Sequence, residues 1–102
     1  MIKIYLAGPI TGLAELNLPE FRKFEEIIKQ QGMEVLVPHD LFTDIDTTDY
    51  LWEDYMKVCL PAMMDCDKVI TLRNWEKSRG TKLEVLVARE LDMPVLPISR
   101  FL

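Results

Sequence analysis

Four short apolar segments alternate with three segments of helical periodicity, and this alternation constrains the fold more than any other feature of the 102-residue chain. Such an alternation predicts βαβ units, in which right-handed crossovers join parallel strands. We therefore predict a single α/β domain over residues 1–102, with three α/β/α layers and a four-stranded parallel sheet wound as in flavodoxin. The expected strands are residues 2–7, 33–37, 68–72 and 94–98, and the expected helices begin at Pro19, near Thr48 or Asp49, and at about Arg79.

Two prolines and one glycine mark the expected helix boundaries. Pro19 occupies a favoured first position, with Asn17 or the following loop as the cap, and Gly32 ends that helix. Pro61 falls inside the second helical segment, where a proline ring clashes with the preceding turn, so we expect a kink or a restart there. In a parallel sheet of this kind, ligands bind beyond the carboxyl ends of the strands. This rule selects three loops as the functional edge, at residues 8–12, 38–47 and 73–80.

The charge balance narrows the classes of partner. The chain has 12 Lys and Arg against 17 Asp and Glu, a formal net charge of -5, and no basic stripe. Nucleic-acid polymers need a phosphate-neutralising surface, so we expect none as a partner, although a small anion can still bind at a helix end. No segment approaches the roughly 18 apolar residues of a membrane span. We expect a cytoplasmic protein without membrane contact.

Cysteine and histidine usage argues against a metal or a disulfide. Cys59 and Cys66 lie seven residues apart, which on one helix separates them by roughly 10 Å, too far for a disulfide. His39 is the only histidine, and no CxxC pair is present. We therefore predict no metal site and no organic cofactor.

Glu84 is the most informative residue of the last helical segment, residues 79–91. It lies three, four and seven residues before Val87, Ala88 and Leu91, and together with Leu83 these residues form the inward stripe. A carboxylate on a packing face is costly unless it is paired, hydrogen-bonded or facing a cleft. The position is also close to the amino end of the helix, whose dipole favours negative charge. The alternative is a border glutamate that tilts into water.

The loops at the functional edge carry further candidates. Ser78 can cap the last helix, and the exposed amides around Gly80 can hold a phosphate or carboxylate. The two glycines of residues 8–12 allow close approach of the backbone to a ligand, although the loop is neither a Walker loop nor GxGxxG. Trp75 can stack on a base or sugar. Each feature also has a structural explanation: an ordinary cap, a tight turn, and packing of the tryptophan against its loop.

Three motifs resemble the nucleoside 2-deoxyribosyltransferase-like superfamily, and in particular its small uncharacterised branch in phage and bacterial genomes. They are YLAGPITG at residues 5–12, CDKVITL at residues 66–72 and WEKSRGTKLEVLVARELDMPV at residues 75–95. Ser78, Gly80 and Glu84 reproduce the S-x-G-x-x-x-E spacing of these enzymes. The resemblance spans essentially the whole chain and implies a nucleoside deoxyribosyltransferase-like fold.

The resemblance implies that Glu84 is the catalytic nucleophile and that the substrate is a nucleoside or nucleotide. In that family a carboxylate attacks the anomeric carbon, releases the base and forms a glycosyl-enzyme ester. A glutamate in a partly apolar wall near a helix amino end is expected to stay anionic yet poorly solvated. By the same resemblance Ser78 and Gly80 hold a 5'-phosphate. The implied substrate-binding residues are Tyr5, Gly8, Pro9, Ile10, Thr11, Gly12, Trp75, Ser78 and Gly80.

The chain departs from the family pattern at the partner of the nucleophile. The family carries an aspartate on the helix before the third strand, where this chain has Cys59 or its neighbour. Asp54, Asp65 or Asp67 could substitute for it. The enzyme hypothesis therefore stands beside two others: a non-catalytic nucleotide-binding or regulatory module in the same cleft, and a scaffold for oligomerisation.

Oligomerisation is expected under all three hypotheses. A four-stranded sheet leaves edge strands, and part of the stripe around Trp52 and Tyr55 lacks cover. We predict a homo-oligomer, a dimer or larger.

Overall fold

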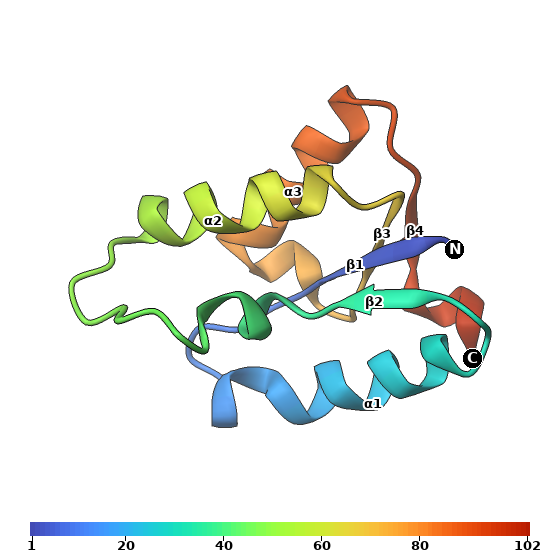
Figure 1. The fold of residues 1–102 in the computed structure, drawn as a ribbon, viewed down its shortest axis with the longest axis horizontal. Coiled ribbons are helices and arrows are strands. Elements are labelled where there is room, and N and C mark those ends of the chain that lie inside the picture. The colour runs from blue at the N-terminus through green and yellow to red at the C-terminus, as the bar shows by residue number, and fades with distance from the viewer.

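The computed structural model describes all 102 residues and places four strands and three α-helices in strict alternation (Figure 1). The sheet has the order β2-β1-β3-β4 with every neighbouring pair parallel, which confirms the predicted flavodoxin-like winding. The elements are β1 (Lys3–Ala7), α1 (Leu18–Lys29), β2 (Glu34–Leu36), α2 (Trp52–Met64), β3 (Lys68–Thr71), α3 (Arg79–Glu90) and β4 (Val95–Pro97). Each strand is one or two residues shorter than predicted.

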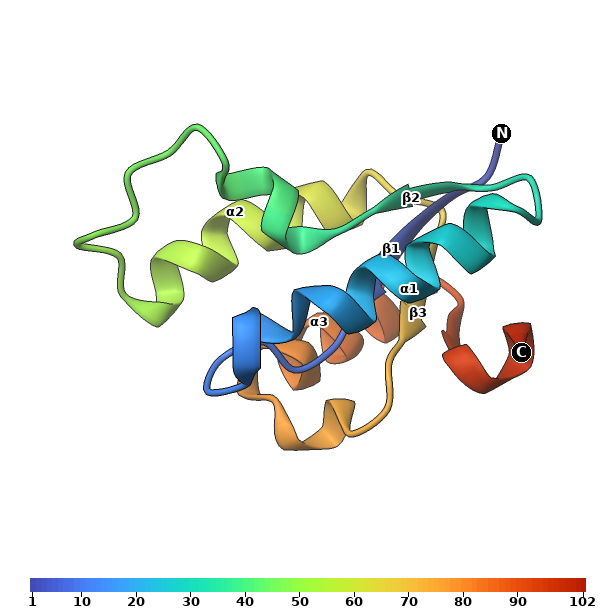
Figure 2. The same cartoon turned by 90° about the horizontal axis from the view of Figure 1, so that it is seen from below.

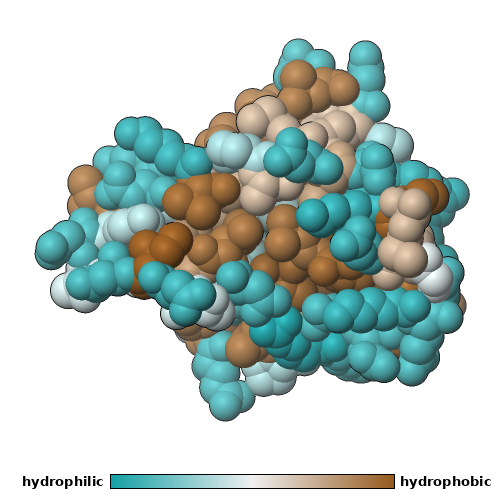
Figure 3. Space-filling view, viewed as in Figure 1, coloured by the Kyte–Doolittle hydropathy of each residue, from teal (hydrophilic) through white to brown (hydrophobic).

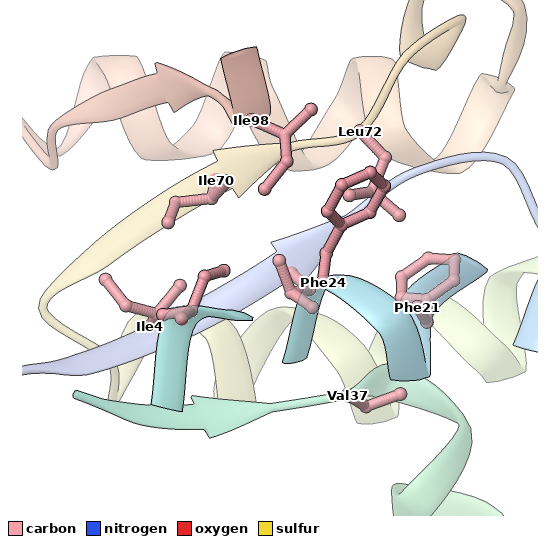
Figure 4. Close-up of a cluster of buried hydrophobic side chains, with 9 residues drawn as sticks. Ile4, Phe21, Phe24, Val37, Ile70, Leu72 and Ile98 are labelled. Atoms are coloured by element: carbon pink, nitrogen blue, oxygen red, sulfur yellow. The ribbon is translucent and has the colours of Figure 1, made fainter. Parts of the chain in front are cut away.

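The sheet is covered on both faces. On one face, which α1 covers (Figure 2), Ile4 and Leu6 of β1 belong to one buried cluster with Phe21, Phe24 and Ile28 of α1 (Figure 4). Successive side chains of a strand point to opposite faces, so the intervening residues of β1 face the other layer. That layer consists of α2 and α3.

The face toward α2 and α3 positions the residues of interest. Tyr5 and Ala7 of β1 form a buried cluster with Met63 of α2 and Ala88 of α3. The same alternation that directs Ile4 and Leu6 to α1 therefore places Tyr5 under α2 and α3.

The buried stripe of α3 differs from the predicted one. Its buried members are Thr81, Glu84, Val85 and Ala88, whereas Leu91 is 52% exposed. Leu91 is the cap residue after the last turn, so it extends beyond the surface that the sheet offers. The rotation of the stripe puts Glu84 near the middle of the buried face.

The second helix begins later than predicted and does not break. The side chain of Asp46 accepts hydrogen bonds from the Thr48 amide at 3.0 Å and hydroxyl at 2.6 Å, which holds this segment in a turn, and α2 starts at Trp52. The predicted restart of the helix at Pro61 is wrong, because one helix runs through it, and a kink there stays a prediction. Pro61 is exposed, so water can reach the carbonyl that loses its partner.

The N-terminal end of α1 also differs in detail. The helix begins at Leu18, one residue before Pro19, and Asn17 stands at the cap position without a side-chain capping bond. Instead, the side-chain amide of Asn17 donates a hydrogen bond from Nδ2 to the Pro9 carbonyl at 2.9 Å. Asn17 therefore anchors the loop after β1 rather than the helix.

The outer surface bears on two predictions. β2 and β4 form the two edges of the sheet. Apolar surface is exposed between α2 and α1, where β2 lies (Figure 3). The homo-oligomer stays a prediction.

The helices of this fold are too short or too polar for any of them to span a membrane.

Candidate active-site cleft

A cleft of about 480 Å³ lies at the carboxyl end of the sheet. Its base is formed by Tyr5 of β1 and Glu84 of α3. The loop after β1, the segment after β2, the first half of α2 and the start of α3 form the walls. Among the predicted site residues, the cleft brings together Tyr5, Gly8, Ile10, Thr11, Ser78, Gly80 and Glu84.

Glu84 is buried at this base, with 6% of its surface exposed. Its one hydrogen bond comes from the Tyr5 hydroxyl, which donates to Oε2. Burial raises the pKa of the Glu84 carboxyl from 4.5 to about 7, because removal from water disfavours the charged form, while the Tyr5 bond acts in the opposite direction. Near pH 7 the carboxyl therefore divides between its neutral and charged forms, rather than staying anionic as expected from the sequence.

Tyr5 is completely buried and remains a hydrogen-bond donor. Its pKa is raised well above the usual 10, first by desolvation and then by the charge of Glu84. A tyrosinate next to a carboxylate in this setting is strongly disfavoured. Tyr5 thus holds the orientation of the Glu84 carboxyl.

Cys59 of α2 occupies the position beside this pair. It lines the cleft and is buried. Desolvation, followed by the charge of Glu84, raises the pKa of the Cys59 thiol to about 11. The group is therefore a neutral thiol across the physiological range.

The three aspartates that could replace a partner carboxylate are all outside the cleft lining. Asp54 accepts the Leu51 amide at 2.9 Å and so caps α2. Asp67 accepts the Lys3 amide at 2.8 Å, at the amino end of β1. Asp65 is exposed at the C-cap of α2. Glu84 is consequently the only carboxylate in the lining.

The start of α3 combines capping with close packing. Ser78 Oγ accepts the Thr81 amide at 3.2 Å and the Thr81 hydroxyl at 3.0 Å, as a helix cap does. A Cβ at Gly80 would lie 3.2 Å from the Met56 sulfur, so the glycine allows α2 to approach. The structural explanations for Ser78 and Gly80 hold here, and both residues also face the cleft.

Some residues of the loop after β1 line the cleft, and others only shape the loop. A Cβ at Gly8 would lie 2.9 Å from Leu72 Cβ, so glycine is required by the neighbouring strand end. Ile10 and Thr11 line the cleft, whereas Pro9 and Gly12 do not. Gly12 has φ +82°, a left-handed turn conformation that favours glycine.

Trp75 lies outside the cleft lining. It belongs to a short 3-10 turn over Trp75–Lys77, and the Arg89 guanidinium lies 6.0 Å from its ring centre. The packing alternative therefore describes Trp75 better than stacking on a ligand.

The structure also places His39, the only histidine, in the cleft wall. Its Nε2 lies 2.8 Å from the Leu16 carbonyl, and a carbonyl only accepts, so Nε2 carries the proton. Nδ1 is buried without a partner, and the ring packs edge-on against Phe21 at 4.7 Å. The sequence signal was its position directly after Pro38, at the end of the second predicted strand.

Three rings form what we call the aromatic wall: Phe42, Trp52 and Tyr55. Phe42 and Tyr55 pack at 5.2 Å between ring centres. The Arg79 guanidinium lies over the Trp52 ring at 3.6 Å from its centre. The sequence predicts a partly uncovered stripe around Trp52 and Tyr55, and helical periodicity alone does not reveal that this stripe faces a cleft.

Several solved structures share this fold, among them the following two. The 2-deoxyribosyltransferase from the psychrotolerant bacterium Bacillus psychrosaccharolyticus has a TM-score of 0.74 and 24% sequence identity, with 93% of this chain and 70% of that chain covered. A conserved protein from Enterococcus faecalis V583 has a TM-score of 0.68 and 21% identity, with 95% and 62% covered. The protein thus has a nucleoside deoxyribosyltransferase-like α/β fold, as the sequence motifs implied.

The sequence itself assigns the chain to a family. Residues 2–97 match the model described as "Domain of unknown function (DUF4406)", and the protein belongs to that family. No curated protein matches the chain.

Proposed function

We propose that the protein cleaves or transfers the N-glycosidic bond of a nucleoside or nucleoside 5'-monophosphate, with Glu84 as the nucleophile. The observation that carries this proposal is Glu84 itself, the only carboxylate lining a cleft of about 480 Å³ and hydrogen-bonded by Tyr5. A buried carboxylate of this kind is costly to the fold and typical of functional sites.

The chemistry follows that of retaining glycosidases. The charged Glu84 carboxylate stabilises the oxocarbenium-like transition state and bonds to the anomeric carbon as the base departs. Tyr5 keeps one carboxylate oxygen occupied, which leaves the other to attack. Water or a second base then resolves the glycosyl ester, giving hydrolysis or transfer.

The walls support a nucleoside-sized ligand. Ser78 and Gly80 lie at the amino end of α3, where amides and the helix dipole favour a phosphate. The aromatic wall offers apolar surface to a base. Glu84 is the only charged group in the lining.

A second candidate is a nucleotide-binding or regulatory module without chemistry. It is favoured by the neutral Cys59 thiol beside Glu84 and by the positions of Asp54, Asp65 and Asp67 outside the cleft. Binding that survives in Glu84→Gln, with no product from any substrate, would support this candidate.

The test is a chromatographic assay for released base. The protein is incubated with ribo- and deoxyribonucleosides and their 5'-monophosphates, with and without an acceptor base. Glu84→Gln and Glu84→Ala are compared with Glu90→Gln, an exposed glutamate on the same helix. We expect base release in wild type and Glu90→Gln only, and exchange with the acceptor would separate transferase from hydrolase. Silence from folded wild type, or release that survives in Glu84→Ala, would overturn the proposal.

A further inference from the structure

The charge of the cleft is one-sided. Glu84 is the only charged side chain among the residues that line it, and no Lys or Arg contributes to the lining. The remaining walls are aromatic, apolar or neutral and polar. A carboxylate facing aromatic rings complements a ligand that carries positive charge.

Three of the cleft's proton-bearing side chains, those of Tyr5, Cys59 and His39, are poorly suited to protonate a departing base. The Tyr5 proton is committed to Glu84, and a raised pKa keeps it there. The Cys59 thiol has a pKa of about 11 and is a weak acid. The proton of His39 points to the Leu16 carbonyl at 2.8 Å.

A neutral base leaves as an unstable anion unless an acid protonates it, and general acids contribute factors of about 10²–10⁴ to such reactions. A base that is already cationic needs no acid, because it departs as a neutral molecule. The residues of this cleft fit the second situation.

We propose that the preferred substrates are nucleosides or nucleotides whose base carries a positive charge at the glycosidic nitrogen or in its ring, such as pyridinium or N7-alkylated purine compounds. This inference rests on the proposed function and names its substrate class.

The reaction balances without a protein acid. A Glu84 oxygen forms a bond to the anomeric carbon, and the electron pair of the carbon–nitrogen bond passes to the base, which neutralises its charge. Water then bonds to the anomeric carbon, the ester electron pair returns to Glu84, and one water proton passes to solvent.

The substrate charge also assists the nucleophile. An opposite charge within about 4–6 Å of a carboxyl favours its ionised form. A cationic base therefore shifts the Glu84 carboxyl, half-neutral near pH 7, toward the charged form that attacks. The guanidinium of Arg79 already lies over Trp52, which leaves Phe42 and Tyr55 to contact the base.

The test uses two substrates that differ by one methyl group and one charge, guanosine and 7-methylguanosine, with nicotinamide riboside as a second cation. Base release at pH 7 is measured with enzyme-free blanks subtracted and Glu84→Gln as the inactive control. We expect kcat/KM for 7-methylguanosine to exceed that for guanosine by about 100-fold or more. Values within about threefold, or a preference for guanosine, would overturn the inference while leaving the proposed function intact. Release from none of the three, while other members of the wider nucleoside panel do release base, would overturn the inference alone. Release from none of the three and from none of the panel would overturn both.

A variant supplies an independent readout. Cys59→Asp places a second carboxyl beside Glu84, and two neighbouring carboxyls share one proton, so that one of the pair can donate it while the other attacks. We expect it to raise guanosine turnover and to narrow the substrate ratio by about tenfold, whereas Cys59→Ala keeps the ratio. An unchanged ratio in folded Cys59→Asp would argue against the inference, and the substrate pair in wild type decides the matter if that variant does not fold.

Discussion

Replacing Glu84 by glutamine is expected to stabilise the folded protein at alkaline pH, with a gain that shrinks as the pH falls. Folding raises the pKa of the Glu84 carboxyl from 4.5 to about 7, so the folded state binds a proton that the unfolded state has released between these two values. The wild type therefore loses stability as pH rises through this window. The uncharged glutamine, of the same shape, does not.

The magnitude follows from the shift. A difference of about 2.5 between the two pKa values corresponds to about 3 kcal/mol at 1.36 kcal/mol per pKa unit. About 1 kcal/mol of this penalty is already present at pH 5, and nearly all of it at pH 8. The stability of Glu84→Gln relative to wild type is expected to grow by about 2 kcal/mol between these two conditions.

Urea unfolding at pH 5, 6, 7 and 8 measures this difference. Glu90→Gln is the matched control, because Glu90 lies exposed on the same helix and its substitution removes one charge without a buried group. The control is expected to follow the wild type at every pH. A constant difference between Glu84→Gln and wild type across the series would refute the reasoning, since the Glu84 carboxyl would then titrate normally in the folded state.

Three further predictions concern the residues around Glu84. Base release by the wild type is expected to rise with pH up to about 7 and then level, because only the charged carboxylate attacks; a rate that falls over this range would contradict the nucleophilic role. In Tyr5→Phe the carboxylate loses its donor, so the midpoint of this pH profile is expected to move to higher pH, measured on the same substrate; an unmoved midpoint would show that the bond does not influence ionisation. Gly8→Ala is expected to destabilise the protein by about 1–3 kcal/mol in urea, compared with the exposed Thr11→Ala, because the new methyl meets Leu72 at 2.9 Å; equal stability of the two would contradict the packing argument.

The sequence predicted the architecture because hydrophobic periodicity and strand–helix alternation determine a parallel sheet almost alone. It also placed Glu84 on the inner face of its helix, since an offset of three or four residues from apolar positions is a local property. It missed the exact stripe, because Leu91 lies past the last turn and the extent of the sheet beneath it is a tertiary property.

The residues that line the cleft could be predicted from sequence only where a motif included them. The spacing of Trp52 and Tyr55 predicts an apolar stripe without full cover, and only the assembled fold shows that their helix borders an open cavity. The resemblance implies that Trp75 binds substrate, yet the residue lies outside the cleft lining, with the Arg89 guanidinium 6.0 Å from its ring centre. The raised pKa of Glu84 depends on burial by several elements of the fold, so it cannot be predicted from the sequence alone.

The hydrogen bond between Tyr5 and Glu84 joins residues 79 positions apart. The two side chains come from the first strand and the last helix, so a chain emerging from the ribosome carries the tyrosine long before its partner exists. A segment ending before α3 has neither the carboxylate nor the wall that α3 supplies. Any activity that needs Glu84 can therefore begin only after almost the entire polypeptide has been synthesised and folded. The onset of that activity during synthesis would mark the point at which the domain is complete.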